Sequence, residues 1–225
     1  PVIGVTGTAG KTMTARLIAH LLDAAGWDVL IPPTGRAENA WPSADTLADL
    51  LDGRTPDALV VELTSTHLAY MSTSPSIAVV TSLGPDHAEL HGGEGRYFAT
   101  KQRILIHQQP GDVAVLPAGA DALVPRAGVE VIRFDSGDAL ADASRVAPHH
   151  RSNVACAVAV VRDALGVDVE QADIDSFAIP GWRGEVIGRT GDIAVFHDGM
   201  AATPAKAAAF VRSLPDRSSV LIVGG

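Results

Sequence analysis

The chain has 225 residues, 47% of them hydrophobic and 4% aromatic, and a formal net charge of −9. These values are typical of a soluble globular protein with one large domain or two small ones. The acidic balance, without any basic run, argues against a nucleic-acid partner. The lack of an apolar window of about 18 residues argues against a membrane span.

Cys156 is the only cysteine, so the chain has no intramolecular disulfide framework and no cysteine zinc cluster. It lies in a run of Ala and Val and is predicted to be a buried apolar residue rather than a reactive thiol. We find no signal-peptide pattern, and a reducing, cytoplasmic location fits the composition. Strand-like sequence at both ends leads us to expect further domains before and after this one.

Strands alternate with helices along the chain. In chain order, the predicted elements are a strand at 2–5, a glycine-rich loop at 4–10, a helix at 11–25, a strand at 29–31, a loop at 34–43, a helix at 44–51, strands at 57–63 and 77–83, a helix at 95–107, strands at 113–116 and 129–134, a polar connector at 136–150, a helix at 153–165, a strand at 194–197, a helix at 205–214 and a strand at 220–223. We therefore expect an α/β fold with a mainly parallel sheet covered by helices on both faces.

The first chemical motif is the glycine-rich loop that ends in Gly10-Lys11-Thr12, between a predicted strand and a predicted helix. Small residues let backbone N–H groups surround phosphate oxygens, and the helix N-terminus adds a positive dipole end. Lys11 is expected to reach the terminal phosphates and the Thr12 hydroxyl to bind magnesium. The strict phosphate-loop pattern has glycine where Val5 stands, and the alternative is a glycine-rich turn before a lysine.

The second motif is Glu62-Leu-Thr64-Ser65, at the end of an apolar strand. A carboxylate at the tip of a parallel strand lies where open α/β sheets place their ligands, and it can hold magnesium opposite the phosphate loop.

The third motif gathers Asp86, His87, Glu89 and His91 after the strand at 77–83. Four such side chains within six residues are a candidate metal site, and the alternative is a solvated polar loop. Lys101 follows on a predicted helix, where an isolated lysine would be a surface charge.

Together these motifs closely resemble the Mur ligases, ATP-dependent acid–amino acid ligases of peptidoglycan precursor synthesis that are related to folylpolyglutamate synthases. The similar residues are Gly4, Thr6, Gly7, Thr8, Gly10, Lys11, Thr12, Glu62, Thr64, Ser65, Asp86, His87, His91, Gly92, Tyr97, Lys101 and Ile104. Further similarity in 149–153, 180–185 and 198–204 extends the resemblance over nearly the whole chain. It implies a P-loop-type nucleotide-binding domain at residues 1–225, the central domain of such a ligase.

The resemblance implies ATP and two magnesium ions as cofactors. The β- and γ-phosphates would be bound by Lys11 and by the loop residues Gly7, Thr8, Ala9 and Gly10. One magnesium ion would be held by Thr12 and Glu62, and the second by His87.

The resemblance also assigns roles to four residues further along the chain. Lys101 matches a lysine that family members often carry as a carbamate, which turns a cation into an anionic metal ligand. Lys11, His87 and Lys101 are the expected catalytic residues. Asn153 is expected to face the adenine, and Arg183 and Asp198 the phosphates and ribose.

Several positions depart from the family pattern. Ala9, Ser82 and His150 stand where asparagine is usual, and Met200 stands where the D-glutamate-adding members have lysine. These members are nonetheless the ones that this chain resembles most, through the spacing of 198–204 and the run around Lys101. The departures bear on the identity of the amino-acid substrate.

The implied reaction transfers the γ-phosphoryl group of ATP to a substrate carboxylate, and an amino acid then attacks the acyl phosphate. The substrates would be a nucleotide-sugar acid and an amino acid, with an N-terminal substrate domain and a C-terminal domain as partners. One alternative is a sister ligase acting on another acid, such as a poly-γ-glutamate, folate-type or natural-product ligase. The other is a non-catalytic nucleotide-binding module.

Overall fold

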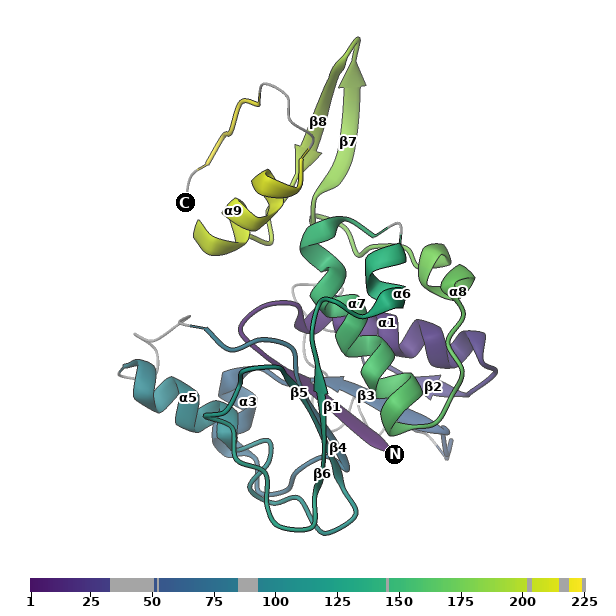
Figure 1. Cartoon of the computed structure of the whole chain (residues 1–225), viewed down its shortest axis with the longest axis vertical. Coiled ribbons are helices and arrows are strands. Elements are labelled where there is room, and N and C mark those ends of the chain that lie inside the picture. The colour runs from purple at the N-terminus through teal and green to yellow at the C-terminus, as the bar shows by residue number, and fades with distance from the viewer. Residues whose placement is uncertain are drawn as a thin grey trace. The chain divides into compact units, whose positions relative to one another are not determined.

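The structure, a computed structural model, describes residues 1–32, 51, 53–84, 93–144, 146–201, 204–214 and 219–223. It contains two compact units, one formed by residues 1–146 and 150–178 and the other by residues 147–149 and 179–225 (Figure 1). The loop predicted at 34–43 and the helix predicted at 44–51, apart from Leu51, lie outside the described residues.

The larger unit is built on a parallel sheet, which confirms the expected α/β fold. Its strand order among the described residues is β2-β3-β1-β4-β5-β6, and every neighbouring pair is parallel. The strands are β1 (Val2–Thr6), β2 (Val29–Leu30), β3 (Ala58–Glu62), β4 (Ile77–Val80), β5 (Val113–Pro117) and β6 (Glu130–Phe134). Val5 pairs with Glu62 and Thr6 with Val80, so the carboxyl ends of three strands meet at one edge.

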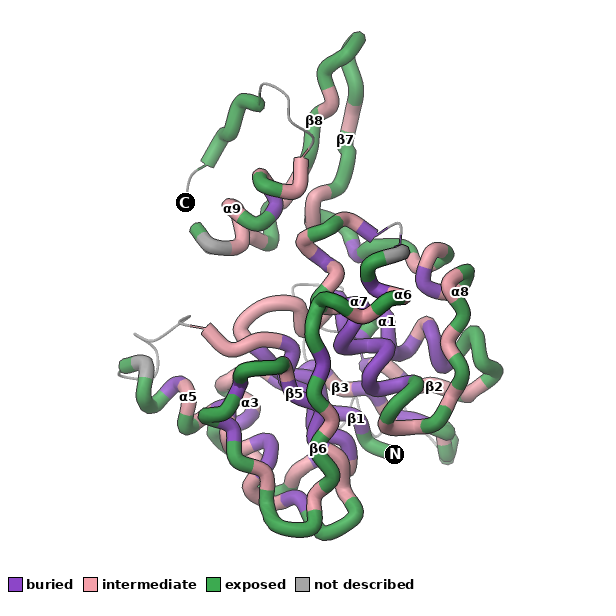
Figure 2. The backbone as a smooth tube through the Cα atoms, viewed as in Figure 1, coloured by how far each residue is buried: buried purple, intermediate pink, exposed green. Residues whose placement is uncertain are grey.

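Helices cover both faces of this sheet because its buried strands alternate their side chains between two apolar cores. In β4, Ile77 and Val79 join one core, while Ala78 and Val80 join the other. The first core is covered by α1 (Lys11–Ala24), α6 (Ala139–Ala143), α7 (Arg151–Val158), its π-helical continuation η2 (Ala159–Ala164) and α8 (Gln171–Ser176). The second is covered by α3 (Ser65–Tyr70) and the residues that follow α5 (Glu94–Gln102). Figure 2 shows the buried residues gathered in the sheet and in α1 and α7.

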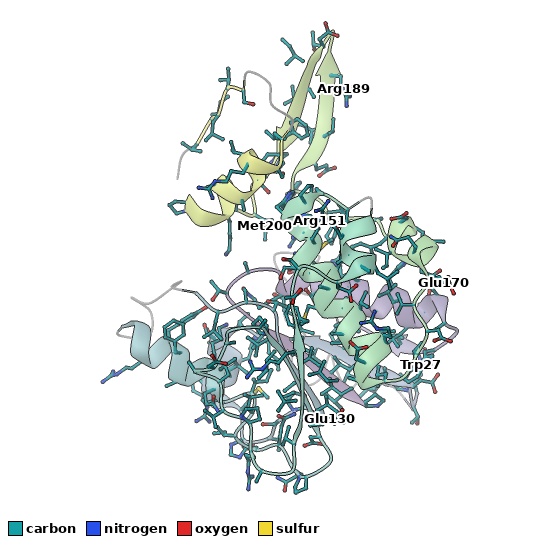
Figure 3. The ribbon with its side chains drawn as sticks, in the orientation of Figure 1. Trp27, Glu130, Arg151, Glu170, Arg189 and Met200 are labelled. Atoms are coloured by element: carbon teal, nitrogen blue, oxygen red, sulfur yellow. The ribbon has the colours of Figure 1, made fainter. Side chains whose placement is uncertain are left out.

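The smaller unit consists of an antiparallel hairpin and a helix. The hairpin joins β7 (Glu185–Thr190) to β8 (Ile193–His197), and the helix is α9 (Pro204–Ser213). The ring of Phe210 in α9 packs edge-on against those of Phe196 and His149. Most of the hairpin is exposed (Figure 2), including the Arg189 side chain labelled in Figure 3.

Several predicted boundaries are wrong. The helix at 95–107 ends at Gln102, because Ile104 N–H donates to the Lys101 carbonyl at 3.3 Å, a tighter turn than an α-helix makes. The connector at 136–150 contains α6 and the 3-10 helix η1 (Pro148–His150). The strand at 220–223 is not formed: an apolar run becomes a strand only beside a partner, and the described residues offer it none.

In the part of the chain that the structure describes, no helix is long and apolar enough to cross a membrane. Cys156 is fully buried in α7, and burial raises the pKa of its thiol far above the usual value. The prediction of a buried core residue is therefore confirmed.

Candidate phosphate-binding site

The glycine-rich loop lies at the point where the order of the strands reverses. The chain runs from β1 to β3 on one side and later to β4 on the other, so β1 sits between them. Open α/β sheets bind ligands at this switch point, outside the carboxyl ends of the strands. The predicted context of strand, loop and helix is confirmed, because the loop links β1 directly to the N-terminus of α1.

Two positions in the loop accept only glycine. Gly10 precedes α1 with a φ of 83°, and a Cβ there would lie 2.0 Å from Asn153 Oδ1. Gly7 has a φ of 147°, and a Cβ there would lie 2.0 Å from Thr81 Oγ1. The loop is therefore packed closely by its neighbours. The Asn153 side chain lies against the start of α1, with its Nδ2 3.3 Å from the Nδ1 of His150.

Thr12 and Glu62, which were predicted to hold one magnesium ion, meet at this edge. The Thr12 hydroxyl donates to the Glu62 carboxylate at 2.8 Å. Thr12 is in the first turn of α1 and Glu62 is the buried last residue of β3. Both are hard oxygen groups that suit magnesium.

Within the described ranges, no cluster of three or more His, Cys, Asp or Glu side chains forms a closed metal cage. Magnesium is usually bound by one or two carboxylates together with water and substrate phosphates. The pair formed by Thr12 and Glu62, beside a phosphate loop, therefore fits a nucleotide-bound magnesium ion.

Two lysines converge on one carbonyl of the loop. The Nζ atoms of Lys11 and Lys101 each donate to the Gly7 carbonyl at 3.1 Å, and Lys101 also donates to Thr6 Oγ1 at 3.2 Å. Lys101 is only 1% exposed, and its Nζ lies 5.1 Å from the centroid of the Tyr97 ring. Lys101 is therefore not the surface charge that an isolated lysine on a helix would be. Lys11 thus brings a positive charge to the loop, which suits an anionic ligand.

Tyr97 belongs to the family motif, but its contact with the loop was not predicted from the sequence. Its hydroxyl lies 3.1 Å from Thr8 Oγ1. Thr8 Oγ1 gives its single proton to the Gly84 carbonyl at 2.9 Å and accepts from the Gly84 N–H at 3.1 Å, so Tyr97 is the donor. Tyr97 and Lys101 lie one helical turn apart in α5, and both hold the loop. Their four-residue spacing is the sequence signal that could have placed both side chains on one face of the helix.

Ser82, just after β4, holds the loop from the other side. Its carbonyl accepts from the Thr8 N–H at 3.1 Å, and its Oγ accepts from the Ala9 N–H at 2.9 Å. The same Oγ donates to the Ala9 carbonyl at 3.1 Å, which also accepts from Thr81 Oγ1. Two amides that we expected to bind phosphate thus have protein acceptors in this structure.

His67 caps the helix that follows Glu62. Its Nδ1 accepts from the Thr64 N–H at 3.0 Å, while its own N–H donates to Thr64 Oγ1 at 3.3 Å, which completes a capping box. Burial lowers the pKa of His67, and the nearby carboxylate of Glu62 opposes this effect. The three-residue spacing from Thr64 is the sequence signal for this cap.

Arg183 and Asp198 lie together in the smaller unit. Asp198 Oδ1 accepts from the Gly184 N–H at 3.1 Å, and Arg183 donates to the Gly181 carbonyl at 3.0 Å. Burial raises the pKa of Asp198, against the lowering effects of His149, the Gly184 N–H, Arg183 and His197. These two predicted residues are therefore neighbours within the smaller unit.

The predicted histidine-rich motif is not described by the structure. Asp86, His87, Glu89 and His91 all lie outside the described residues.

Comparison with known proteins identifies the family. The Mur ligase middle domain matches residues 5–170. The UDP-N-acetylmuramoylalanine–D-glutamate ligase of Nitratidesulfovibrio vulgaris (strain DP4) is 30% identical over 230 residues, covering 100% of this chain and 51% of the relative. The UDP-N-acetylmuramoyl-L-alanine–L-glutamate ligase of a Micromonospora species is 31% identical over 267 residues, covering 99% and 53%. The chain thus spans about half the length of these curated relatives.

Solved structures show the same fold. The MurF ligase of Thermotoga maritima in complex with ADP superposes with a TM-score of 0.74 at 22% identity, covering 95% of this chain and 56% of that one. The E. coli FolC protein in complex with DHPP and ADP gives 0.69 at 19% identity, covering 96% and 66%. With the family match over residues 5–170, these findings show that the chain belongs to the Mur ligase middle domain family.

Proposed function

We propose that this chain is the ATP-binding domain of an ADP-forming ligase of peptidoglycan precursor synthesis, which adds an amino acid to a UDP-N-acetylmuramoyl substrate. One observation carries the proposal. A glycine-rich loop that carries Lys11 leads into a pair of oxygen groups that suits magnesium, in which Thr12 Oγ1 lies 2.8 Å from Glu62 Oε2. The names of the relatives supply the reaction class.

The residues of the chain act mainly by binding and positioning. Lys11, Gly7, Thr8, Ala9 and Gly10 would hold the phosphates, aided by the positive end of the α1 dipole. Thr12 and Glu62 would hold magnesium, which neutralises charge on the phosphate oxygens when bound.

The reaction would then proceed in two steps. A substrate carboxylate attacks the γ-phosphorus and ADP leaves, and the amine of an amino acid attacks the acyl phosphate and releases phosphate. Asn153 would face the adenine, and Arg183 with Asp198 would contact the phosphates and ribose.

Lys101 is the candidate for a carbamate. Its Nζ lies at the phosphate loop, 3.1 Å from the Gly7 carbonyl, so carbamylation would place an anionic group beside the loop. With His87 it would hold a second magnesium ion. Isotopically labelled bicarbonate should give a carbamate signal by NMR that is absent in Lys101→Met. A wild-type protein without that signal would overturn this part of the proposal.

The whole enzyme would include domains beyond this central one, namely an N-terminal domain for the nucleotide-sugar acid and a C-terminal domain. It would work in the cytoplasm on small molecules, without a nucleic-acid or membrane partner.

The relatives named above use D-glutamate or L-glutamate, so glutamate is the amino acid to test first. The whole enzyme, with its N- and C-terminal domains, would be incubated with MgATP, UDP-N-acetylmuramoyl-L-alanine and either enantiomer of glutamate, and ADP and the amide product would be measured. Product with one enantiomer supports the proposal. ATP binding without product from either would point to a sister ligase for another acid.

A further inference from the structure

The phosphate loop already uses donors that a nucleotide would need. The Ala9 N–H donates to Ser82 Oγ at 2.9 Å and the Thr8 N–H to the Ser82 carbonyl at 3.1 Å. An N–H group carries one proton and cannot bond two acceptors at full strength. A phosphate oxygen that accepts a hydrogen bond from either N–H must therefore displace the Ser82 oxygen that now accepts it.

The position of Ser82 is fixed by the sheet. The preceding residue, Thr81, donates through its N–H to the Thr6 carbonyl at 2.8 Å. This places the Ser82 hydroxyl where it both accepts from the Ala9 N–H and donates to the Ala9 carbonyl. Ala9 has no polar side chain of its own that could take over these bonds.

We propose that the Ser82 hydroxyl is an internal competitor of the nucleotide phosphates and thereby sets the nucleotide affinity of the loop. The inference rests on the proposed function, because it presumes that the loop binds ATP. Ser82 is then a positioning residue: it acts through the Ala9 amide and does not contact the nucleotide. Its removal is expected to strengthen binding, whereas removal of a residue that contacts the nucleotide would weaken it.

The same sheet provides a matched control. Ser76, at the opposite end of β4, accepts from the Val2 N–H at 3.1 Å and donates to the Val2 carbonyl at 3.1 Å. Ser76→Ala therefore removes the same pair of bonds away from the loop.

The experiment is a calorimetric titration with MgATP. Ser82→Ala should bind about 3- to 10-fold more tightly than the wild type, the worth of about one net hydrogen bond, and Ser76→Ala should bind like the wild type. Ser82→Thr and Ser82→Val have side chains of the same shape but differ in the hydroxyl group. Ser82→Val is expected to bind MgATP more tightly than Ser82→Thr. Unchanged or weaker binding in Ser82→Ala would overturn the inference.

Amide hydrogen exchange tests the contact without nucleotide. The Ala9 N–H should be protected in the wild type and should exchange faster in Ser82→Ala; equal protection would overturn the inference.

The role of Ser82 and the proposed function can be overturned separately. Binding by the wild type without tightening in Ser82→Ala removes only the role of Ser82, while no MgATP binding by either protein removes the proposed function as well.

Discussion

The hydrogen bond between Thr12 and Glu62 joins α1 to β3 and places a carboxylate next to the phosphate loop. Glu62→Gln keeps an oxygen that can accept this bond but removes the negative charge. We expect the gain in ATP affinity that magnesium provides to fall by at least about 10-fold, or ~1.4 kcal/mol. The measurement is an ATP titration with and without magnesium.

The control for this variant is Glu130→Gln, the same change at an exposed residue of β6 labelled in Figure 3. It should leave the magnesium dependence unaltered. An unaltered dependence in Glu62→Gln would remove Glu62 from the metal site.

His67 predicts how stability depends on pH. Burial lowers the pKa of its side chain in the folded state, while the unfolded chain keeps the ordinary value of about 6.5. Between these two values the unfolded state binds more protons, so the free energy of unfolding falls as the pH is lowered through this window. The full contribution is present above about pH 6.5.

His67→Gln removes this titration and keeps a side chain that can accept from the Thr64 N–H. Urea unfolding at several pH values should therefore show a smaller loss of stability below pH ~6.5 in the variant. His149, whose pKa is also lowered by burial, remains in both proteins. Identical pH profiles would show that the titration of His67 does not contribute.

At the scale of elements, the start of α1 depends on the backbone of Gly10. Gly26, just beyond the end of α1, has nearly the same φ, 85° against 83°, but a Cβ there would meet nothing within 4 Å. Gly26→Ala therefore measures the cost of the left-handed conformation alone, about 1–2 kcal/mol. Gly10→Ala should lose more stability, because its Cβ would strike Asn153 Oδ1.

Urea unfolding of the two variants gives this difference directly. Gly10→Ala should also weaken MgATP binding, while Gly26→Ala should not. Equal losses of stability would mean that the Asn153 side chain moves away without cost.

The central strands β1, β3, β4 and β5 could be predicted because parallel strands buried on both faces are continuous apolar runs. β7 was missed because its residues are largely exposed and no such run marks it. The run at 220–223 shows the opposite error, since its composition suits a strand but no neighbour pairs with it among the described residues. Whether such a segment forms a strand depends on a pairing partner elsewhere in the chain, which a local sequence pattern does not reveal.

The contacts of the site divide in the same way into predictable and unpredictable ones. The meeting of Thr12 with Glu62 could be predicted, since a loop after one parallel strand faces the ends of its neighbours. The contacts of Ser82 and Tyr97 could not, because they depend on the register of β1 against β4 and on the rotation of α5.

At the scale of the whole molecule, the predicted nucleotide-binding residues are divided between the two units. The phosphate loop and Asn153 belong to the larger unit, and Arg183 and Asp198 to the smaller one. We expect the loop to be the primary anchor, because Lys11 and the pair of Thr12 and Glu62 would bind the phosphates and their magnesium ion. MgATP should therefore bind even where the smaller unit contributes little.

The most direct test is a calorimetric titration of the protein with MgATP, beside Lys11→Ala and Arg16→Ala. Both variants remove one positive charge from α1, but Arg16 is exposed and lies more than a helical turn beyond the loop. The account predicts micromolar to millimolar binding by the wild type and by Arg16→Ala, and its loss in Lys11→Ala. Equal affinity in Lys11→Ala and the wild type, or no binding by the wild type, would contradict it.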